Sequence, residues 1–162
     1  MRLILDTSFL IELKRGNPAT RKILEERMEE CEDIVISAIT AYELLVGAYY
    51  TFKRYGDARD IIAIDDMLSA LTISPVDFGI AKRAAGIKAE LKLKGLSIPD
   101  IDIIIASTDS DKSGEILTFD EDFIRLKDLG FNVNLLSKDK VEEDRDNYVN
   151  NNIPDPRQGR QG

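Results

Sequence analysis

Four carboxylates of this 162-residue chain stand at positions where a reactive site could be built: Asp6, Glu43, Asp102 and Asp120. Asp6 directly follows a short apolar run, and Asp102 is surrounded by isoleucines. Carboxylates that are held together repel one another and raise one another's pKa. A hard divalent cation such as Mg²⁺ or Mn²⁺ relieves that repulsion, because these ions prefer oxygen ligands. A metal held in this way can activate water and stabilise the charge that develops when a phosphodiester bond is displaced.

The composition excludes most other hydrolytic chemistry. The chain has no histidine, which removes Ser-His-Asp triads, Cys-His dyads and histidine-bound metals. Cys31 is the only cysteine, so neither an intrachain disulfide nor a multi-cysteine zinc cluster is possible. Hydrolysis would have to use carboxylates, lysine or a metal bound by oxygen. The net charge of −8 argues against broad nucleic-acid binding, although a bound divalent ion reverses the sign of its own surroundings.

Length and hydropathy indicate an ordinary globular protein. The chain suits one domain, and its 43% hydrophobic and 32% charged residues are typical of soluble proteins. No apolar run approaches the length that spans a bilayer, and the N-terminus has no long apolar stretch before a small-residue cleavage site. We therefore expect no membrane association and a cytoplasmic location.

Strand and helix patterns alternate along the chain, which predicts an α/β fold, a three-layer sandwich around a central, mostly parallel sheet of about five strands. In such a sheet the carboxyl ends of the strands meet at one edge, so the four acids are expected to share that edge. The expected strands are 2–6, 34–36, 71–73, 114–118 and 131–135. The expected helices are 8–14, 18–30, 38–54, 57–70 and 77–94, with one beginning at 97–100 and a short helical stretch ending at 130.

The helix at 38–54 carries an apolar stripe beside one of the acids. Ile39, Tyr42, Val46 and Tyr49 follow helical spacing and are expected to face the core. Glu43 then lies inside or beside that stripe. If the stripe is rotated by one residue, Glu43 points to solvent instead.

Several acids also have ordinary structural interpretations. Asp6 could cap the helix that follows it. Asp100 fits a charge at a helix start, favoured by the helix dipole. Asp109 shares a helix face with Asp102 but lies about 10 Å further along the axis, and we expect it to be solvated. The last acidic position has three neighbouring candidates: Asp120, Glu121 and Asp122.

Four segments together carry a family resemblance that extends from residue 2 to about residue 136. They are Leu-Asp-Thr-Ser-Phe-Leu-Ile at 5–11, Ser-Ala-Ile-Thr-Ala-Tyr-Glu-Leu at 37–44, the stretch from Ile-Ala-Lys-Arg at 80–83 through Gly95 and Ile-Pro-Asp-Ile-Asp at 98–102 to Ile-Ala at 105–106, and Leu-Thr-Phe-Asp-Glu-Asp-Phe at 117–123. The sequence resembles a PIN-domain ribonuclease of the VapC toxin type. One minor departure is Ser107, where the family often has alanine.

The resemblance implies metal-dependent endonucleolytic cleavage of RNA, usually by homodimers, and a small antitoxin protein that blocks the site. It implies that Asp6 and Asp102 are the main ligands of Mg²⁺ or Mn²⁺. Glu43 and Asp120 would bind a second ion or orient water. The hydroxyl positions that support such a site fall on Ser8 and Thr118, and basic residues must guide the RNA. The candidates are Lys53, Arg54, Lys82, Arg83, Lys88, Lys92 and Lys94.

Composition changes near residue 138. We expect a nuclease domain at 1–137 and a largely disordered acidic and polar extension at 138–162, which has too little apolar surface to bury. The role of the extension is open.

Three other functions remain to be weighed. The chain could be a stand-alone PIN nuclease in RNA processing, without an antitoxin. It could be a catalytically inactive PIN-fold module that binds RNA or acts as a scaffold. A phosphotransfer protein also places an Asp after its first strand, but a phosphatase of the haloacid-dehalogenase type needs a second Asp two residues later, where this chain has Ser8.

Overall fold

The computed structural model describes residues 1–138 and 143. Almost all of the expected extension at 138–162 therefore lies outside the described residues, and the domain boundary at 137 stays a prediction. The elements are β1 (Arg2–Leu5), α1 (Thr7–Lys14), α2 (Pro18–Met28), β2 (Asp33–Ser37), α3 (Ala38–Tyr55), α4 (Arg59–Ser69), β3 (Thr72–Ser74), α5 (Phe78–Leu93), α6 (Asp100–Ala106), β4 (Glu115–Thr118), the 3-10 helix η1 (Glu121–Leu129) and β5 (Asn132–Leu135).

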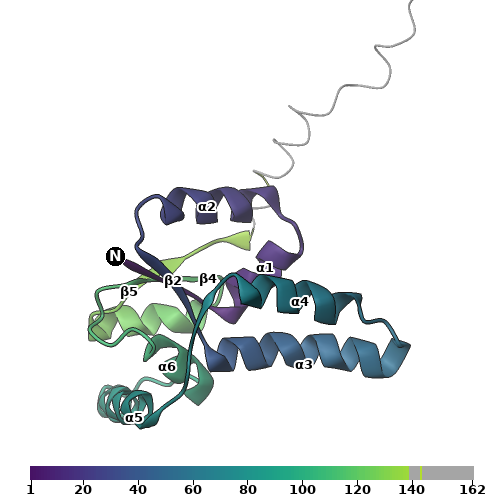
Figure 1. Ribbon diagram of the computed structural model, residues 1–162. Coiled ribbons are helices and arrows are strands. Elements are labelled where there is room, and N and C mark those ends of the chain that lie inside the picture. Colours follow the sequence, from purple (N-terminus) through teal and green to yellow (C-terminus); the bar gives the residue numbers. More distant parts are fainter. Residues whose placement is uncertain (139–142, 144–162) are drawn as a thin grey trace, which may run out of the picture.

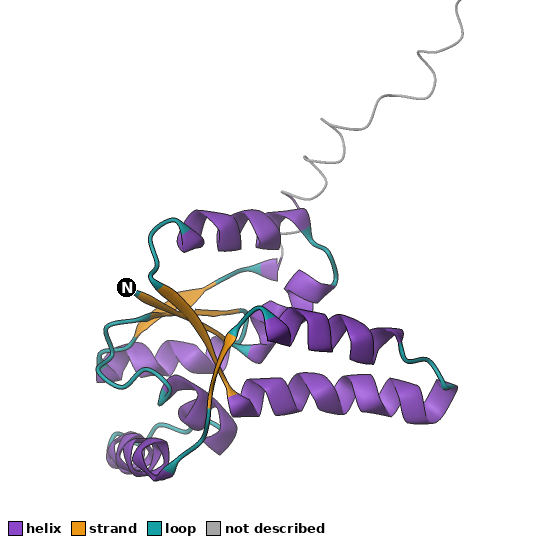
Figure 2. Cartoon of the chain, in the orientation of Figure 1, coloured by secondary structure: helices purple, strands orange, loops and turns teal. Residues whose placement is uncertain are grey.

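A single five-stranded parallel sheet runs through the domain with helices on both faces (Figures 1 and 2). The strand order is β3-β2-β1-β4-β5. The chain moves outward from β1 to β3 and then returns to add β4 on the other side of β1. The order therefore reverses between β1 and β4, and in open α/β sheets ligands bind at the carboxyl edge of such a point. The predicted fold class is confirmed.

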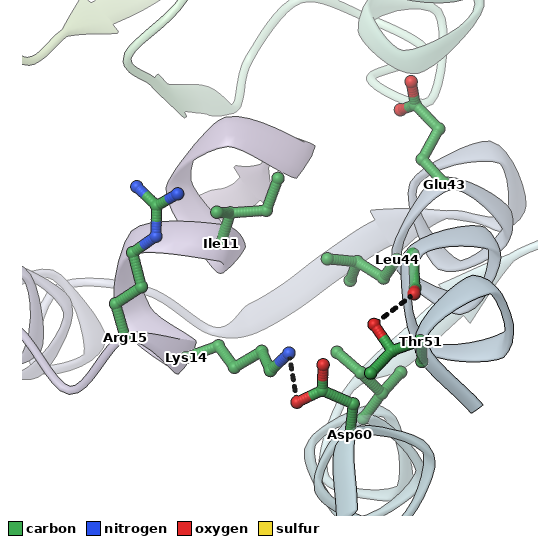
Figure 3. A pocket seen from close by; sticks show the side chains of 10 residues that line it. Ile11, Lys14, Arg15, Glu43, Leu44, Thr51 and Asp60 are labelled. Carbon is green, nitrogen blue, oxygen red and sulfur yellow. Dashed lines mark hydrogen bonds and ion pairs between the residues drawn. The ribbon is translucent and has the colours of Figure 1, made fainter. Parts of the chain in front are cut away.

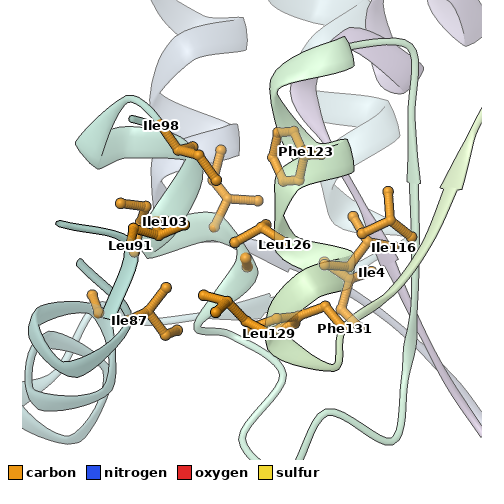
Figure 4. Packing of buried hydrophobic residues seen from close by; sticks show 14 residues of the cluster. Ile4, Ile87, Leu91, Ile98, Ile103, Ile116, Phe123, Leu126, Leu129 and Phe131 are labelled. Carbon is orange, nitrogen blue, oxygen red and sulfur yellow. The ribbon is translucent and has the colours of Figure 1, made fainter. Parts of the chain in front are cut away.

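Each face of the sheet carries its own core, because successive side chains of a strand point to opposite sides. Leu3 and Leu5 pack toward α1, α2, α3 and α4. Ile4, between them in β1, packs toward the opposite layer of α5, α6 and η1, where it meets Ile116 of β4 and Phe123 of η1 (Figure 4). Packing in these two cores fixes where β1 and β4 end. It therefore also fixes the positions of the residues that directly follow these strands.

The residues at the two ends of α5 follow the usual capping preferences of helices. Asp77 caps α5, since its Oδ1 accepts the backbone N–H of Ile80 at 2.8 Å. Gly95, just after the last turn of that helix, has a φ of +68°, a conformation that glycine adopts without steric cost. Both the start and the stop expected for this helix are confirmed.

The expected core face of α3 is wrong. Tyr42, Val46 and Tyr49 are 59%, 48% and 49% exposed, whereas the buried positions include Leu44 and Ala48. The inward face carries alanines and a leucine because α3 packs against its neighbours at close range. The large apolar residues lie on the other side of the helix, where they remain accessible.

A smaller correction concerns α6. The sequence pattern predicts that Ile101, Ile104 and Ile105 pack in the core, and this prediction is wrong for Ile101, which is 39% exposed. Ile103 takes its place and is 1% exposed, together with the fully buried Ile105. Asp102 is half-buried between these residues, in the first turn of the helix.

Candidate metal centre

The fold brings the four predicted acids to one edge of the sheet. Asp6 follows β1 and Asp120 follows β4, the two strands on either side of the point where the strand order reverses. Glu43 lies in the second turn of α3, the helix that follows β2, and Asp102 lies in the first turn of α6. The charges of Asp120, Asp6 and Glu43 all act on Asp102, so the acids share one electrostatic environment.

Asp6 is both a helix cap and a member of the acidic cluster. Its side chain is almost fully buried, and its Oδ2 accepts the backbone N–H and the hydroxyl of Ser8 (3.2 and 2.5 Å) and the hydroxyl of Thr118 (2.9 Å). No hydrogen bond among the described residues goes to Oδ1. One oxygen therefore holds the carboxylate in place, and the lone pairs of the other stay available to a ligand.

Ser8 and Thr118, the expected supporting hydroxyls, connect β1 to β4 around Asp6. Ser8 Oγ accepts the backbone N–H of Phe119, and Thr118 Oγ1 accepts that of Asp120, each at 2.9 Å. The same two hydroxyls donate to Asp6. The network fixes Asp6 and the start of the segment that carries Asp120 relative to each other.

Glu43 is half-buried and does not point into solvent. Its Oε2 accepts a hydrogen bond from Thr7 Oγ1 at 2.5 Å, so the residue after Asp6 holds the acid of α3. The sequence did not indicate this role for Thr7. Its contact with Glu43 spans 36 positions of the chain and could not be found from local spacing.

Asp102, Asp120 and Asp122 form the tightest group, since each offers a carboxylate oxygen within 4.8 Å of the others. Of the three candidates left open for the last position, Asp120 and Asp122 both lie in this group, whereas Glu121 is exposed. Asp120 Oδ1 also accepts the backbone N–H of Asp122 at 2.9 Å, which caps η1 and holds the two acids together.

The pKa of Asp102 shows that the carboxylates of the cluster repel one another. Burial, followed by the charges of Asp120, Asp6, Asp122 and Glu43, raises the pKa of Asp102 from 3.8 to about 7. Arg125 pairs with Asp122, but its guanidinium lies at the outer side of the group and is partly exposed. The repulsion is therefore only partly compensated by the protein's own charges.

The donor set fits a hard divalent cation. Every candidate ligand is a carboxylate, and several oxygens converge without a matching number of lysines or arginines. Mg²⁺ and Mn²⁺ prefer oxygen ligands, and a cation would stabilise the ionised form of Asp102.

A groove of about 350 Å³ leads away from the site between α1, α3 and α4 (Figure 3). Glu43 lies at one end of it. Ile11, Leu44 and Ile64 supply apolar surface, and the cationic side chains along the wall are Lys14 and Arg15. Lys14 pairs with Asp60 at 2.8 Å and Arg15 with Glu12 at 2.5 Å, so both charges are partly balanced.

The residues expected to guide RNA differ in whether their side chains already have contacts within the protein. Arg83 Nε donates to the backbone carbonyl of Ser107, and Lys88 Nζ donates to that of Ile98, so both have structural contacts. Arg54 lies over the ring of Tyr55. The remaining candidates, Lys53, Lys82, Lys92 and Lys94, are exposed.

Two further acids were weighed from the sequence. Asp100 is exposed in the first turn of α6 and pairs with Lys88 at 2.8 Å, which lowers the pKa of its carboxyl. This agrees with a charge at a helix start. The expectation that Asp109 is solvated is wrong, because its side chain is only 2% exposed. The loop after α6 folds back over it and covers it.

A parallel sheet with an acidic cluster at its reversal point can be compared with the folds of known protein families. The model of the PIN domain family matches residues 3–129, so the chain belongs to the PIN-domain family. The matched segment includes every acid of the cluster.

Relatives within the family carry the name VapC. Ribonuclease VapC2 of Haemophilus influenzae is 34% identical over 107 residues, covering 66% of this chain and 77% of the relative. The structure of VapBC-1 from nontypeable Haemophilus influenzae contains a chain with 25% identity and a TM-score of 0.66, covering 83% of this chain and 98% of that one. A chain of VapBC2 from Rickettsia felis, bound to a promoter DNA fragment, superposes with a TM-score of 0.72 at 23% identity, covering 85% of this chain and 100% of its own.

The helices can be compared with the length and hydropathy that a membrane-spanning helix needs. In the part of the chain that the structure describes, no helix is both long enough and apolar enough to cross a membrane.

Proposed function

We propose that this protein is an endoribonuclease of the VapC type, which hydrolyses RNA phosphodiester bonds with Mg²⁺ or Mn²⁺ and is the toxin of a toxin–antitoxin pair. One observation carries the proposal: five carboxylates gather at the reversal point of the sheet, and burial followed by the charges of the other four raises the pKa of Asp102 to about 7. The curated relative is a ribonuclease, which gives the acidic cluster its substrate class.

The residues divide into ligands and supports. Asp102, Asp120 and Asp122 would hold a cation directly, and Asp6 and Glu43 complete its coordination or hold a second one. When bound, such a metal supplies Lewis acidity toward a phosphoryl oxygen and a more acidic bound water. Ser8 and Thr118 keep Asp6 in one orientation, and Thr7 keeps Glu43 in one orientation. Glu43, at the border of the cluster and the groove, is the acid placed to accept a proton from water.

The direct experiment is cleavage of RNA by the purified chain. We expect cleavage with Mg²⁺ or Mn²⁺ and none in EDTA. Cleavage that continues in EDTA would contradict a metal mechanism. Absence of both cleavage and metal binding would favour an inactive RNA-binding or scaffold module.

The groove in Figure 3 suits the antitoxin of the pair. Its mixture of apolar and cationic side chains fits an amphipathic peptide segment that presents apolar residues and acids. Because Glu43 lies at one end of the groove, a segment bound there would cover part of the acidic cluster. A solved toxin–antitoxin complex from Klebsiella pneumoniae contains a chain that is 27% identical to this one, which supports a protein partner of this kind.

Gly47 allows that contact to be tested without disturbing the fold. It lines the groove, and a Cβ built on it meets no heavy atom within 4 Å. We expect Gly47→Trp to fill the groove and weaken inhibition by the antitoxin encoded beside the toxin. Gly86→Trp is a matched control, because Gly86 is also helical with open space around it but lies on α5. Equal inhibition of both variants would exclude the groove as the antitoxin site.

The exposed face of α3 supports the expected homodimer. Tyr42, Val46 and Tyr49 lie on one side of this helix, and each is about half exposed. Three large apolar side chains in one row are typical of a surface that a partner covers. We expect Val46→Asp to shift the protein to monomer in sedimentation, and an unchanged mass would place the dimer contact elsewhere.

A further inference from the structure

The loop between α6 and β4 holds a carboxylate that the acidic cluster does not use. Asp109 lies at the amino edge of the sheet and is 2% exposed. Its Oδ2 accepts the backbone N–H of Gly114 at 2.9 Å. Its Oδ1 is buried and has no hydrogen-bond partner among the described residues. Burying an oxygen atom without a hydrogen-bond donor lowers the stability of the fold, so we expect this atom to bind a ligand.

The group that faces Asp109 is another carboxylate. Burial raises the pKa of Asp109, the Gly114 N–H lowers it, and a contact with the carboxyl of Asp111 raises it again. Two ionised carboxylates are both acceptors, so nothing in the pair can satisfy Oδ1. A shared proton or a cation between the two carboxylates would satisfy this atom.

We propose that this loop binds a divalent cation of the Ca²⁺ type through the carboxylates of Asp109 and Asp111 and the hydroxyl of Ser113. The segment reads Asp-Ser-Asp-Lys-Ser-Gly, which places oxygen ligands at the first, third and fifth positions and glycine at the sixth. That order resembles the first half of a calcium-binding loop, with serine in place of Asp or Asn at the fifth position. Asp111 and Ser113 are exposed, so a cation can reach the buried Oδ1 from their side.

The glycine of this pattern is required by the packing. A Cβ on Gly114 would lie 2.6 Å from Ile4 Cδ1 and 2.9 Å from the carbonyl oxygen of Arg2. The backbone therefore approaches β1 closely enough for its N–H to hold Oδ2 of Asp109. The orientation of the carboxylate is fixed before any cation arrives.

The site is expected to be weak. In a complete calcium loop a bidentate acid at the twelfth position closes the coordination shell, and that position here is Asp120. Asp120 lies beyond the other end of β4, in the acidic cluster, and cannot reach. Arg2 also acts on Asp109 and competes with a cation. We therefore expect a dissociation constant at the weak end of the range of calcium sites, about 10⁻⁴ to 10⁻³ M.

Calorimetric titration with CaCl₂ tests the proposal on the full chain carrying Asp102→Asn and Asp120→Asn, which weakens cation binding by the acidic cluster. We expect one weak site in that range. Adding Asp111→Asn should weaken calcium binding by about tenfold or more, because affinity depends on the number of charged ligands. Asp111 is exposed, so this variant should fold. Asp65→Asn, another exposed acid, is the matched control and should leave binding unchanged.

Two results would overturn the proposal. One is no calcium binding at concentrations about tenfold above the expected range. The other is equal binding with and without Asp111→Asn. If calcium has no effect and Asp109→Asn raises the unfolding temperature at alkaline pH, a shared proton satisfies the pair and the cation site does not exist.

Discussion

The two edges of the same sheet carry carboxylates in opposite ways. At the amino edge Glu115 of β4 is buried, yet its Oε1 accepts the side-chain amide of Asn134 at 2.9 Å and its Oε2 lies 3.4 Å from Arg27 Nε. At the carboxyl edge Asp102 faces other carboxylates, and its pKa is raised to about 7. Glu115 has partners supplied by the fold, and Asp102 is surrounded by groups of its own sign.

The difference between Glu115 and Asp102 indicates that the two edges of the sheet have different roles. A buried charge that is paired and hydrogen-bonded contributes to a defined structure, whereas uncompensated charges lower stability and persist where they serve a ligand. Ser8, Thr7 and Thr118 hold the acids of the carboxyl edge in place without neutralising them. That edge holds a preorganised cluster of acids. Neither Asp109 Oδ1 nor Glu115 Oε2 has a hydrogen-bond partner among the described residues, but Glu115 has Arg27 within ion-pair distance. Asp109 has no such ion pair among the described residues and is the exception at the amino edge.

The largest expected effect is on catalysis at the carboxyl edge. Asp102→Asn keeps the side-chain volume but removes a charged ligand, so we expect RNA cleavage to fall by more than about a hundredfold. Asp6→Asn should behave similarly. Gel-based cleavage assays at fixed Mg²⁺ measure the effect.

Asp100→Asn is the control for this prediction. Asp100 lies on the same helix, is exposed and pairs with Lys88, so its loss should leave cleavage nearly unchanged. Comparable losses in Asp100→Asn and Asp102→Asn would mean that helix stability, and not ligation, limits the reaction.

A smaller effect is expected at Thr7, which we regard as a positioning residue. Thr7→Val removes the hydroxyl that holds Glu43 at 2.5 Å but keeps the shape of the side chain. We expect cleavage to fall by about tenfold, with a higher Mg²⁺ concentration needed for half-maximal rate, as is usual when a support of a metal ligand is lost. Thr7→Ser should restore both values. A Thr7→Val enzyme with unchanged Mg²⁺ dependence would remove Thr7 from the site.

At the amino edge the corresponding change should affect stability alone. Arg27→Ala leaves the buried Glu115 carboxylate with one partner fewer, and we expect the free energy of unfolding to fall by about 1–3 kcal/mol. The catalytic rate should not change. Lys22→Ala on the same helix is the control, because its pair with Glu26 is exposed and should contribute little. Urea unfolding of both variants gives the comparison, and a loss of activity in Arg27→Ala at full folding would mean that the two edges are coupled.

The sequence predicted much of the fold because its signals are local. Three local signals agree with the structure, and each depends on neighbouring residues only. They are the apolar run before Asp6, the cap at Asp77 and the glycine at Gly95. The four acids were found because a carboxylate among apolar residues or directly after a strand is unusual. Their shared edge then followed from the parallel sheet.

What the sequence missed depends on packing between distant segments. The core face of α3 was misassigned because the helix has apolar residues on two sides, and periodicity alone cannot tell which side carries the small residues that pack inward. The contact of Thr7 with Glu43 and the burial of Asp109 arise from tertiary structure. Asp122 joined the cluster because η1 turns its first residues back toward Asp102.

The most direct test of the acidic cluster is the stability of wild type and Asp102→Asn compared across pH. The pKa of Asp102 is raised from 3.8 to about 7 in the folded state, so between these values the folded protein binds more protons than the unfolded chain. The contribution of Asp102 to stability must therefore decrease as pH rises through this window. Asparagine cannot ionise, and the variant lacks this loss.

In EDTA we therefore predict that the unfolding temperature of wild type falls relative to that of Asp102→Asn as pH rises from about 4 to about 8. Addition of Mg²⁺ or Mn²⁺ at the upper end of that range should raise the unfolding temperature of wild type and leave the variant nearly unchanged. Parallel pH curves for the two proteins, with the same response to the cation, would contradict the central claim that Asp102 belongs to a crowded acidic site built to hold a metal.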